Sequence, residues 1–160
     1  MIVLGVGEYG ATSHRGEVIR TIGLGSCVAV MCHDPKGGIA GMIHVALPDS
    51  SVATVKPIPK PGYYADTGIP ALFESLRRVG WRKESGRLAV KLAGGASIMD
   101  PNGAFNIGKR NLLAIKRILW GMGMGPVAED VGGGHSRTVS IDADTGAIVI
   151  TSPGREPVSI

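Results

Sequence analysis

Cys27 and His44 are the two side chains whose types and spacing best suit covalent chemistry. Cys27 follows Gly-Leu-Gly-Ser in TIGLGSCVAV (21–30), and His44 lies in MIHVALP (42–48). A cysteine attacks as the thiolate, and its ordinary pKa of about 8.5 leaves little thiolate at neutral pH. A histidine within hydrogen-bond reach can take the thiol proton and return it to a leaving amine. The alternative is that both side chains simply fill a strand core.

Two further parts of such a site stand close to Cys27 in the sequence. Thr21 precedes it by six residues, and its hydroxyl can accept a hydrogen bond from an imidazole and orient the ring. The glycine-rich segment that includes Gly25 and Ser26 can turn backbone N–H groups, with that of Cys27, toward a developing oxyanion. The sequence therefore predicts catalytic roles for Cys27, His44 and Thr21, and site-shaping roles for Gly25 and Ser26.

A β-hairpin is expected to bring the thiol toward the imidazole. The apolar runs CVAVMCHD (27–34) and GIAGMIHVALP (38–48) are both β-prone. Between them, Asp-Pro-Lys-Gly (34–37) has the residue order of a type I turn.

The register of this hairpin decides whether Cys27 meets His44. If 34–37 form a four-residue loop, position 33 pairs with 38 and Cys27 stands opposite His44. If Gly37 is instead a bulge and position 34 pairs with 38, the two side chains point to opposite faces. A bulge at Gly41 would also alter the register, and the sequence leaves these alternatives open.

Two ligand sites are weighed and rejected. Zinc at Cys27, Cys32, His33 and His44 would need the pattern Cys-x4-Cys-His-x10-His, which matches none of the usual spacings, and cysteines five apart in a strand face opposite ways. The Gly-x-Gly-x-x-Gly match GVGEYG (5–10) follows a predicted strand, but no helical pattern follows to receive a pyrophosphate, so a turn is the better interpretation. We expect no metal and no cofactor.

The remaining patterns predict the elements around the site. Two amphipathic helices are expected in DTGIPALFESLRRVG, where Asp66 or Thr67 can cap, and in NIGKRNLLAIKRILWGMG, with Asn106 as cap. The proline-bearing segment SSVATVKPIPKPGYY is expected to be an extended loop. Because strands arrive as hairpins rather than in alternating βαβ units, the fold class is α+β, with both helices on one face of a largely antiparallel sheet. Besides the hairpin, strands are expected in MIVLGV, GEVIRTIGL, RLAVKLAGG, GPVAEDVGG, RTVSIDAD and GAIVITS.

Composition excludes several classes of protein. The chain has 160 residues, of which 44% are apolar and 19% charged, which suits one ordered domain spanning 1–160. A net charge of +4, with no Lys/Arg run longer than two and few aromatic residues, argues against nucleic-acid binding. No apolar stretch is long enough to span a membrane, and the first residues do not resemble a signal peptide. Together with two unpaired cysteines, this predicts a cytoplasmic protein without membrane insertion.

The chain resembles the chemoreceptor glutamine deamidase family, CheD. The resemblance begins in LGSCVAVMCHDPKGGIAGMIHVALP and covers nearly the whole chain, because further family motifs follow in the right order. These motifs are YYADTGIPAL, KLAGGASIM, IGKRN and VGGGHSRTV.

The resemblance implies a protein-glutamine deamidase with a Cys-His-Thr triad, and the family's nucleophile, base and hydroxyl partner fall on Cys27, His44 and Thr21. It implies a layered α/β/β sandwich, no metal or cofactor, and hydrolysis of glutamine side chains on the helical cytoplasmic part of chemotaxis receptors. It also implies the CheC phosphatase as a candidate regulatory partner. Arg110, Asn111 and Arg137, which lie in these motifs, are candidate receptor contacts, although surface ion pairing would account for them equally.

Two rival hypotheses belong to other classes of protein. A non-catalytic adaptor could bind receptor helices or CheC and retain the triad by inheritance. A redox or nucleotide-binding domain is disfavoured, because the chain has no Cys-x-x-Cys motif and no helical pattern follows GVGEYG.

Overall fold

The fold is α+β, with two five-stranded sheets and two main helices. The structure is a computed structural model that describes residues 1–86, 88–98, 100 and 102–160, with the side chain of residue 85 left out. The first sheet has the order β1-β3-β8-β9-β10 and the second the order β2-β5-β4-β6-β7. The strands of the first sheet are β1 (Ile2–Leu4), β3 (Val18–Leu24), β8 (Arg137–Asp142), β9 (Ile148–Thr151) and β10 (Val158–Ser159). Those of the second are β2 (Tyr9–Thr12), β4 (Val28–Asp34), β5 (Ile39–Val45), β6 (Ala89–Gly94) and β7 (Ala128–Val131).

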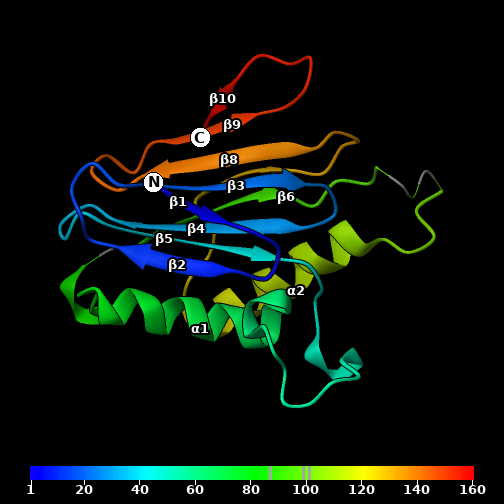
Figure 1. Cartoon of the computed structure of the whole chain (residues 1–160), viewed down its shortest axis with the longest axis horizontal. Coiled ribbons are helices and arrows are strands. Elements are labelled where there is room, and N and C mark those ends of the chain that lie inside the picture. The colour runs from blue at the N-terminus through cyan, green and yellow to red at the C-terminus, as the bar shows by residue number, and fades with distance from the viewer. Residues whose placement is uncertain (87, 99, 101) are drawn as a thin grey trace.

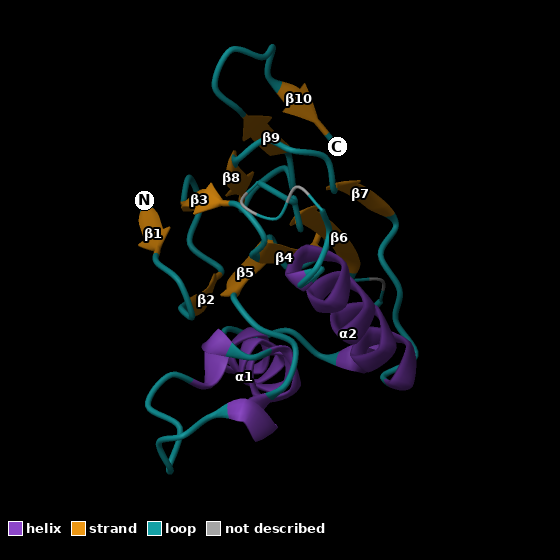
Figure 2. Ribbon diagram, turned by 90° about the vertical axis from the view of Figure 1, so that its right-hand side faces the viewer, coloured by secondary structure: helices purple, strands orange, loops and turns teal. Residues whose placement is uncertain are grey.

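Both helices cover the same face of the second sheet, whose other face packs on the first sheet. Figure 1 shows the second sheet between the first sheet and the helices α1 (Ala65–Arg78) and α2 (Ile107–Gly121). Figure 2 shows the same three layers with the strands seen end-on. The expected α/β/β sandwich with two helices on one face is confirmed.

Strand β4 shows how the alternation of side chains builds the two core layers. Val28, Val30 and Cys32 belong to the cluster under the helices, whereas Ala29 and Met31 belong to the cluster between the sheets. All seven residues of the strand are buried, and the first five, Val28–Cys32, form a continuous apolar run rather than an alternating one.

The expected pairing is largely confirmed, with two strands missed. β1 pairs with β3 and β6 with β7 in parallel, and the other neighbouring strands are antiparallel, including the expected β8–β9 hairpin. β2 and β10 were not expected: β2 is only four residues long and contains a glycine, and β10 has two residues. Such short segments carry too little periodicity to be recognised.

The helices form where expected, but neither Asp66 nor Thr67 caps α1. The apolar stripe of α1 is buried as its spacing predicts, yet Tyr64 occupies the N-cap position and no side chain caps it. Asp66 accepts hydrogen bonds from Ser50, and Thr67 donates to the carbonyl of Pro61. Both side chains therefore fasten the loop before α1 rather than the first turn of the helix.

The N-terminus of α2 is organised by a residue outside the helix. Asn106 is at the N-cap position in a left-handed conformation (φ 51°), and its side chain makes no cap hydrogen bond. The Asp100 carboxylate instead accepts the backbone N–H groups of Ala104, Phe105 and Asn106, at 2.8–2.9 Å. These bonds lower the pKa of Asp100, because they favour its charged form.

The segment before α1 is largely irregular, as expected from its prolines. It contains two single-turn 3-10 helices, η1 (Ser50–Val52) and η2 (Pro61–Tyr63), and no longer element. Among the described residues, no helix has the length and hydrophobicity needed to cross a membrane.

Candidate active site

Thr21 and His44 form a buried hydrogen bond between the two sheets. The hydroxyl oxygen of Thr21 on β3 lies 2.7 Å from Nδ1 of His44 on β5, and both side chains are completely buried. The Thr21 hydroxyl donates its proton to the carbonyl of Leu4 on β1, at 2.8 Å. Because a hydroxyl has one proton, its oxygen accepts from Nδ1–H of His44. The ring is thereby held in the tautomer that leaves a lone pair on Nε2.

The second ring nitrogen of His44 is free. Nε2 is buried and has no hydrogen-bond partner in the described part of the chain. Burial lowers the pKa of His44 to about 4, because a charged ring loses its hydration there, and the Glu8 carboxylate opposes this shift only in part. At neutral pH the ring is therefore a neutral base with an unoccupied acceptor.

The backbone of His44 is held by the turn between β1 and β2, which we call the N-terminal turn (residues 5–8). Gly7 N–H donates to the carbonyl of His44 at 2.9 Å, and His44 N–H donates to the carbonyl of Glu8 at 3.0 Å. The motif GVGEYG thus forms a turn, as predicted, and no helix follows it.

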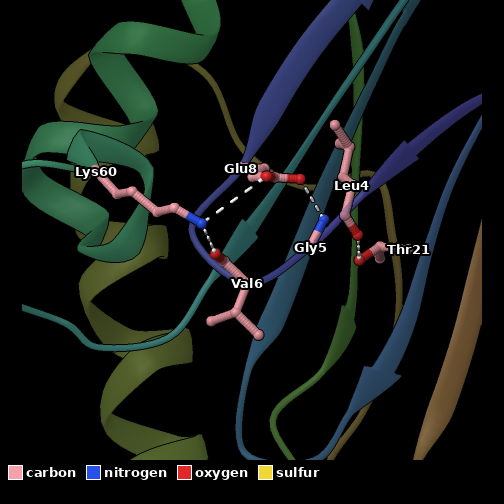
Figure 3. Close-up of polar contacts among 6 residues, drawn as sticks. All are labelled: Leu4, Gly5, Val6, Glu8, Thr21 and Lys60. Carbon is pink, nitrogen blue, oxygen red and sulfur yellow. Dashed lines mark hydrogen bonds and ion pairs between the residues drawn. The ribbon is translucent and has the colours of Figure 1, made fainter.

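Side chains brace the N-terminal turn from two directions (Figure 3). The Glu8 carboxylate accepts the N–H of Gly5 at 2.6 Å and lies 3.8 Å from the Lys60 ammonium group. Lys60 also donates to the carbonyl of Val6, at 3.4 Å. Figure 3 shows Leu4, whose carbonyl accepts from Thr21, directly before this turn. The same short segment therefore positions both members of the Thr21–His44 pair.

The observed hairpin register differs from both registers that the sequence suggested. Position 34 pairs with 39, so the four-residue loop comprises 35–38 rather than 34–37. The Asp34 side chain accepts the N–H of Lys36, the second residue of the loop, at 3.0 Å, and so fastens the start of the loop to the end of β4. Ala29, not Cys27, stands directly opposite His44.

Cys27 nevertheless lies on the same side of the second sheet as His44. It precedes Ala29 by two residues, so its position is diagonal to His44, and it packs against the cluster between the sheets. Cys32 is fully buried under the helices, on the opposite face, as predicted from its spacing. The structure thus brings Cys27, His44 and Thr21 to one end of the layer between the sheets.

The thiol of Cys27 is half-buried and in its protonated form at neutral pH. Burial raises the pKa of Cys27, and the contact with the residue's own backbone N–H compensates only in part. Since Nε2 of His44 has no partner among the described residues, the two groups are not hydrogen-bonded to each other. At neutral pH the Cys27 thiol and the His44 imidazole are therefore both uncharged.

Residues 25–27, which we call the Cys27 loop, are held by their carbonyl groups. The carbonyl of Gly25 accepts the N–H of Ala96, and that of Cys27 accepts the N–H of Gly95, both at 2.8 Å. Gly94 must be a glycine, because its φ is 112° and a Cβ there would collide with the Cys27 carbonyl. Apart from the contact of Cys27 N–H with its own sulfur, no hydrogen bond of the described residues uses the N–H of Ser26 or Cys27.

A cavity of about 690 Å³ opens beside the Cys27 loop. Its wall includes Gly25 and Ser26, and it extends over Ala96, Gly133 and the first turn of α2. Within the described part of the chain, no group of three or more His, Cys, Asp or Glu side chains is arranged to hold a metal ion.

Two of the three predicted receptor contacts are wrong. Asn111 is completely buried, and its side-chain amide donates to the carbonyl groups of Ser26 and Ala46. Arg137 is also buried. Its guanidinium group donates to the carbonyl of Gly132 at 2.9 Å and forms an ion pair with the Asp130 carboxylate at 3.3 Å. Neither side chain is available to a partner surface. Helical spacing carried the signal for Asn111, which lies four and eight residues before the buried Ile115 and Leu119. Of the three, Arg110 is the one that is exposed.

Comparison with known proteins identifies the family. The family model described as "CheD chemotactic sensory transduction" matches residues 46–152. "Probable chemoreceptor glutamine deamidase CheD" of Syntrophotalea carbinolica is 53% identical over 154 residues, covering 96% of this chain and 95% of that protein. "Chemoreceptor glutamine deamidase CheD" of Thermotoga maritima is 44% identical over 152 residues, covering 95% and 92%. The chain therefore belongs to the CheD family.

Proposed function

We propose that this chain is a cytoplasmic protein-glutamine deamidase that converts glutamine side chains of chemotaxis receptors to glutamate. The proposal takes 1–160 as one catalytic domain. Its support is membership of the CheD family, the names of the similar proteins, and a thiol and a neutral imidazole on one face of the second sheet.

The observation that carries the proposal is the hydrogen bond from His44 Nδ1 to Thr21, whose own proton goes to the carbonyl of Leu4. This arrangement leaves Nε2 as the only basic nitrogen of the ring. A histidine that served only to join the two sheets would not need one buried nitrogen without a partner, since an unpaired buried polar atom costs about 1–3 kcal/mol.

In the first half of the proposed reaction, Cys27 attacks the carbon of the glutamine side-chain amide. Nε2 of His44 takes the thiol proton as the C–S bond forms, which gives a tetrahedral oxyanion and an imidazolium. The imidazolium then protonates the amide nitrogen, the C–N bond breaks, and ammonia leaves behind a thioester. Because both groups are neutral at rest, the proton moves during the attack and not before it.

In the second half, water hydrolyses the thioester. Nε2 of His44 takes a proton from the attacking water, and the C–S bond breaks with return of that proton to sulfur. The product is a glutamate side chain and the free thiol. Thr21 keeps the ring in one orientation through both halves, and no cofactor takes part in the scheme.

The oxyanion in both halves needs hydrogen-bond donors. The N–H groups of Ser26 and Cys27 are the candidates, because the carbonyl groups of the Cys27 loop are all engaged while these N–H groups bind no other described residue. Removing one such donor from an enzyme commonly lowers kcat about 10²- to 10³-fold.

The experiment is mass spectrometry of a receptor cytoplasmic fragment incubated with the chain. Conversion of glutamine to glutamate adds about one mass unit per site, and a thioester to Cys27 is the covalent intermediate to be trapped. Cys27→Ala is expected to abolish conversion. Cys32→Ala is the matched control, because this second thiol is fully buried on the other face and is expected to leave conversion unchanged.

Conversion by Cys27→Ala at the wild-type rate would overturn the mechanism. Binding of the receptor fragment without any conversion by the wild-type chain would favour a non-catalytic adaptor. The proposal includes CheC as a regulatory partner, and co-purification of the two proteins tests that part separately.

A further inference from the structure

Asn111 is a buried polar residue that the reaction scheme does not use. It lies on α2, is completely buried, and faces the ends of two strands of the second sheet. Its side-chain nitrogen donates to the carbonyl of Ser26 and to the carbonyl of Ala46, each at 3.0 Å. Both amide hydrogens are therefore committed, one to the Cys27 loop and one to the end of the strand that carries His44.

The bond to Ser26 acts on the peptide that also contains the N–H of Cys27. A trans peptide is planar, and its C=O and N–H point in opposite directions. The single cis peptide bond recorded for the described residues is at 56–57, so the Ser26–Cys27 peptide is trans. When Asn111 holds the Ser26 carbonyl toward α2, the N–H of Cys27 must point away from α2.

Asn111 completes the set of bonds that fix the Cys27 loop. The carbonyl groups before and after that of Ser26 are held by backbone N–H groups of residues 95–96, whereas the Ser26 carbonyl has only Asn111 among the described residues. Donation to a carbonyl also polarises the whole peptide and strengthens its N–H as a donor. One side chain thus sets both the direction and the strength of a candidate oxyanion donor.

Packing alone does not account for an asparagine at this position. The side-chain oxygen of Asn111 is buried without a partner in the described part of the chain, which is unfavourable, and neighbouring inward positions of α2 carry Ile115 and Leu119. A helix that only needed to cover the sheet would carry an apolar residue there.

We propose that Asn111 is a positioning residue that aims the N–H of Cys27 at the oxyanion of the tetrahedral intermediate. The inference rests on the proposed function, since it concerns the same site. Asn111 does not touch the substrate, and it acts through the Ser26–Cys27 peptide.

The experiment compares two reactions of Cys27 in Asn111→Leu, a variant of similar shape without the two donors. Amide hydrolysis passes through an oxyanion, whereas alkylation by iodoacetamide displaces iodide at a saturated carbon and forms none. The background is Cys32→Ala, which leaves Cys27 as the single cysteine, since the chain has two. We expect kcat for receptor deamidation to fall about 10- to 100-fold, with KM and the alkylation rate within about threefold of the parent.

Asn111→Ser is the second variant, because serine is smaller than asparagine and cannot overpack the buried position, and its single short hydroxyl cannot hold both carbonyl groups. It is expected to show the same split between deamidation and alkylation. Unchanged deamidation, an equal fall in both reactions, or loss of folding in both variants would overturn the positioning role. If the parent chain itself modifies no receptor glutamine, the proposed function fails first, and the parent measurement alone reports this.

Discussion

Two buried histidines join the two sheets, and only one of them is arranged for chemistry. His33 on β4 and His44 on β5 lie at opposite ends of one sheet face, because His33 pairs with Ala40 whereas His44 pairs with Ala29. Nε2 of His33 donates to the carbonyl of Ala143 in the turn between β8 and β9, at 3.0 Å. His44 reaches the first sheet through Nδ1, and its Nε2 binds no other described residue.

The difference lies in which ring nitrogen makes the contact and in the kind of group that it meets. A carbonyl partner forces Nε2 of His33 to be protonated, so that nitrogen serves as a donor and cannot act as a base. A hydroxyl partner whose proton is already used makes Nδ1 of His44 the donor and leaves Nε2 basic. The same residue type therefore gives a structural link at one end and a candidate base at the other, and the distinction comes from Leu4 and Thr21.

The strongest test of this comparison replaces each histidine by glutamine. His44→Gln removes the proposed base, and deamidation is expected to fall about 10³-fold or more. His33→Gln is expected to keep kcat within about threefold while lowering the free energy of unfolding by about 1 kcal/mol, because only one hydrogen bond between the sheets is perturbed. Receptor mass spectrometry and urea denaturation measure the two effects.

An equal loss of activity in both variants would contradict the assignment, since it would mean that any disturbance between the sheets disables the site. Equal retention of activity would remove His44 from the mechanism.

The second test uses pH and needs no activity. The pKa of His44 is about 4 in the folded chain and about 6.5 in the unfolded chain. Between pH 6.5 and pH 4 the ring is therefore protonated in the unfolded state and neutral in the folded state. The stability contributed by the neutral ring is complete above pH 6.5 and is lost as the pH falls through 4. Relative to His44→Gln, the wild-type chain is expected to lose about 3 kcal/mol of unfolding free energy between pH 7 and pH 4.

Urea denaturation of both proteins across this range measures the difference. Parallel pH dependence of the two proteins would show that His44 titrates normally, and would remove the argument for a neutral base at rest.

The third test removes the hydroxyl that sets the tautomer. Thr21→Val keeps the shape of the side chain but leaves the carbonyl of Leu4 and Nδ1–H of His44 without partners. We expect kcat to fall about 10- to 100-fold with KM nearly unchanged, because the ring loses its orientation but the substrate surface does not change. Thr21→Ser restores the hydroxyl and is expected to recover most of kcat. Equal activity of the valine and serine variants would exclude an orienting role for the hydroxyl.

Local patterns predicted two helices on one face of a largely antiparallel sheet, whereas the α/β/β layering was implied by the family resemblance. The apolar stripes of α1 and α2 and the opposite faces of Cys27 and Cys32 follow from periodicity, and the β8–β9 turn follows from its Asp- and Gly-containing residues. The family resemblance assigned roles to Cys27, His44 and Thr21, which the structure brings to one end of the layer between the sheets.

What the sequence could not predict depends on contacts between distant segments. The hairpin register turned on whether Asp34 would stay in the strand, and the N-terminal turn gave no sign that it would hold the backbone of His44. The role of Asn111 was equally hidden, because its two partners are 85 and 65 residues away. Such partners are defined only once the helices have packed on the sheet.

The smallest expected effect comes from replacing Glu8, whose negative charge acts on the pKa of His44. The Glu8 carboxylate raises the pKa of His44 against the larger effect of burial, so Glu8→Gln is expected to lower that pKa further. The acid limb of the pH profile of kcat/KM then moves to lower pH, by less than about one unit, because Glu8 is half-exposed and solvent screens its charge. Glutamine keeps an oxygen for the N–H of Gly5, so the N-terminal turn is retained. Lys60→Met removes the cation beside Glu8 and is expected to move the acid limb to higher pH. Shifts in the same direction for both variants would mean that a change in the N-terminal turn, and not the charge, acts on His44.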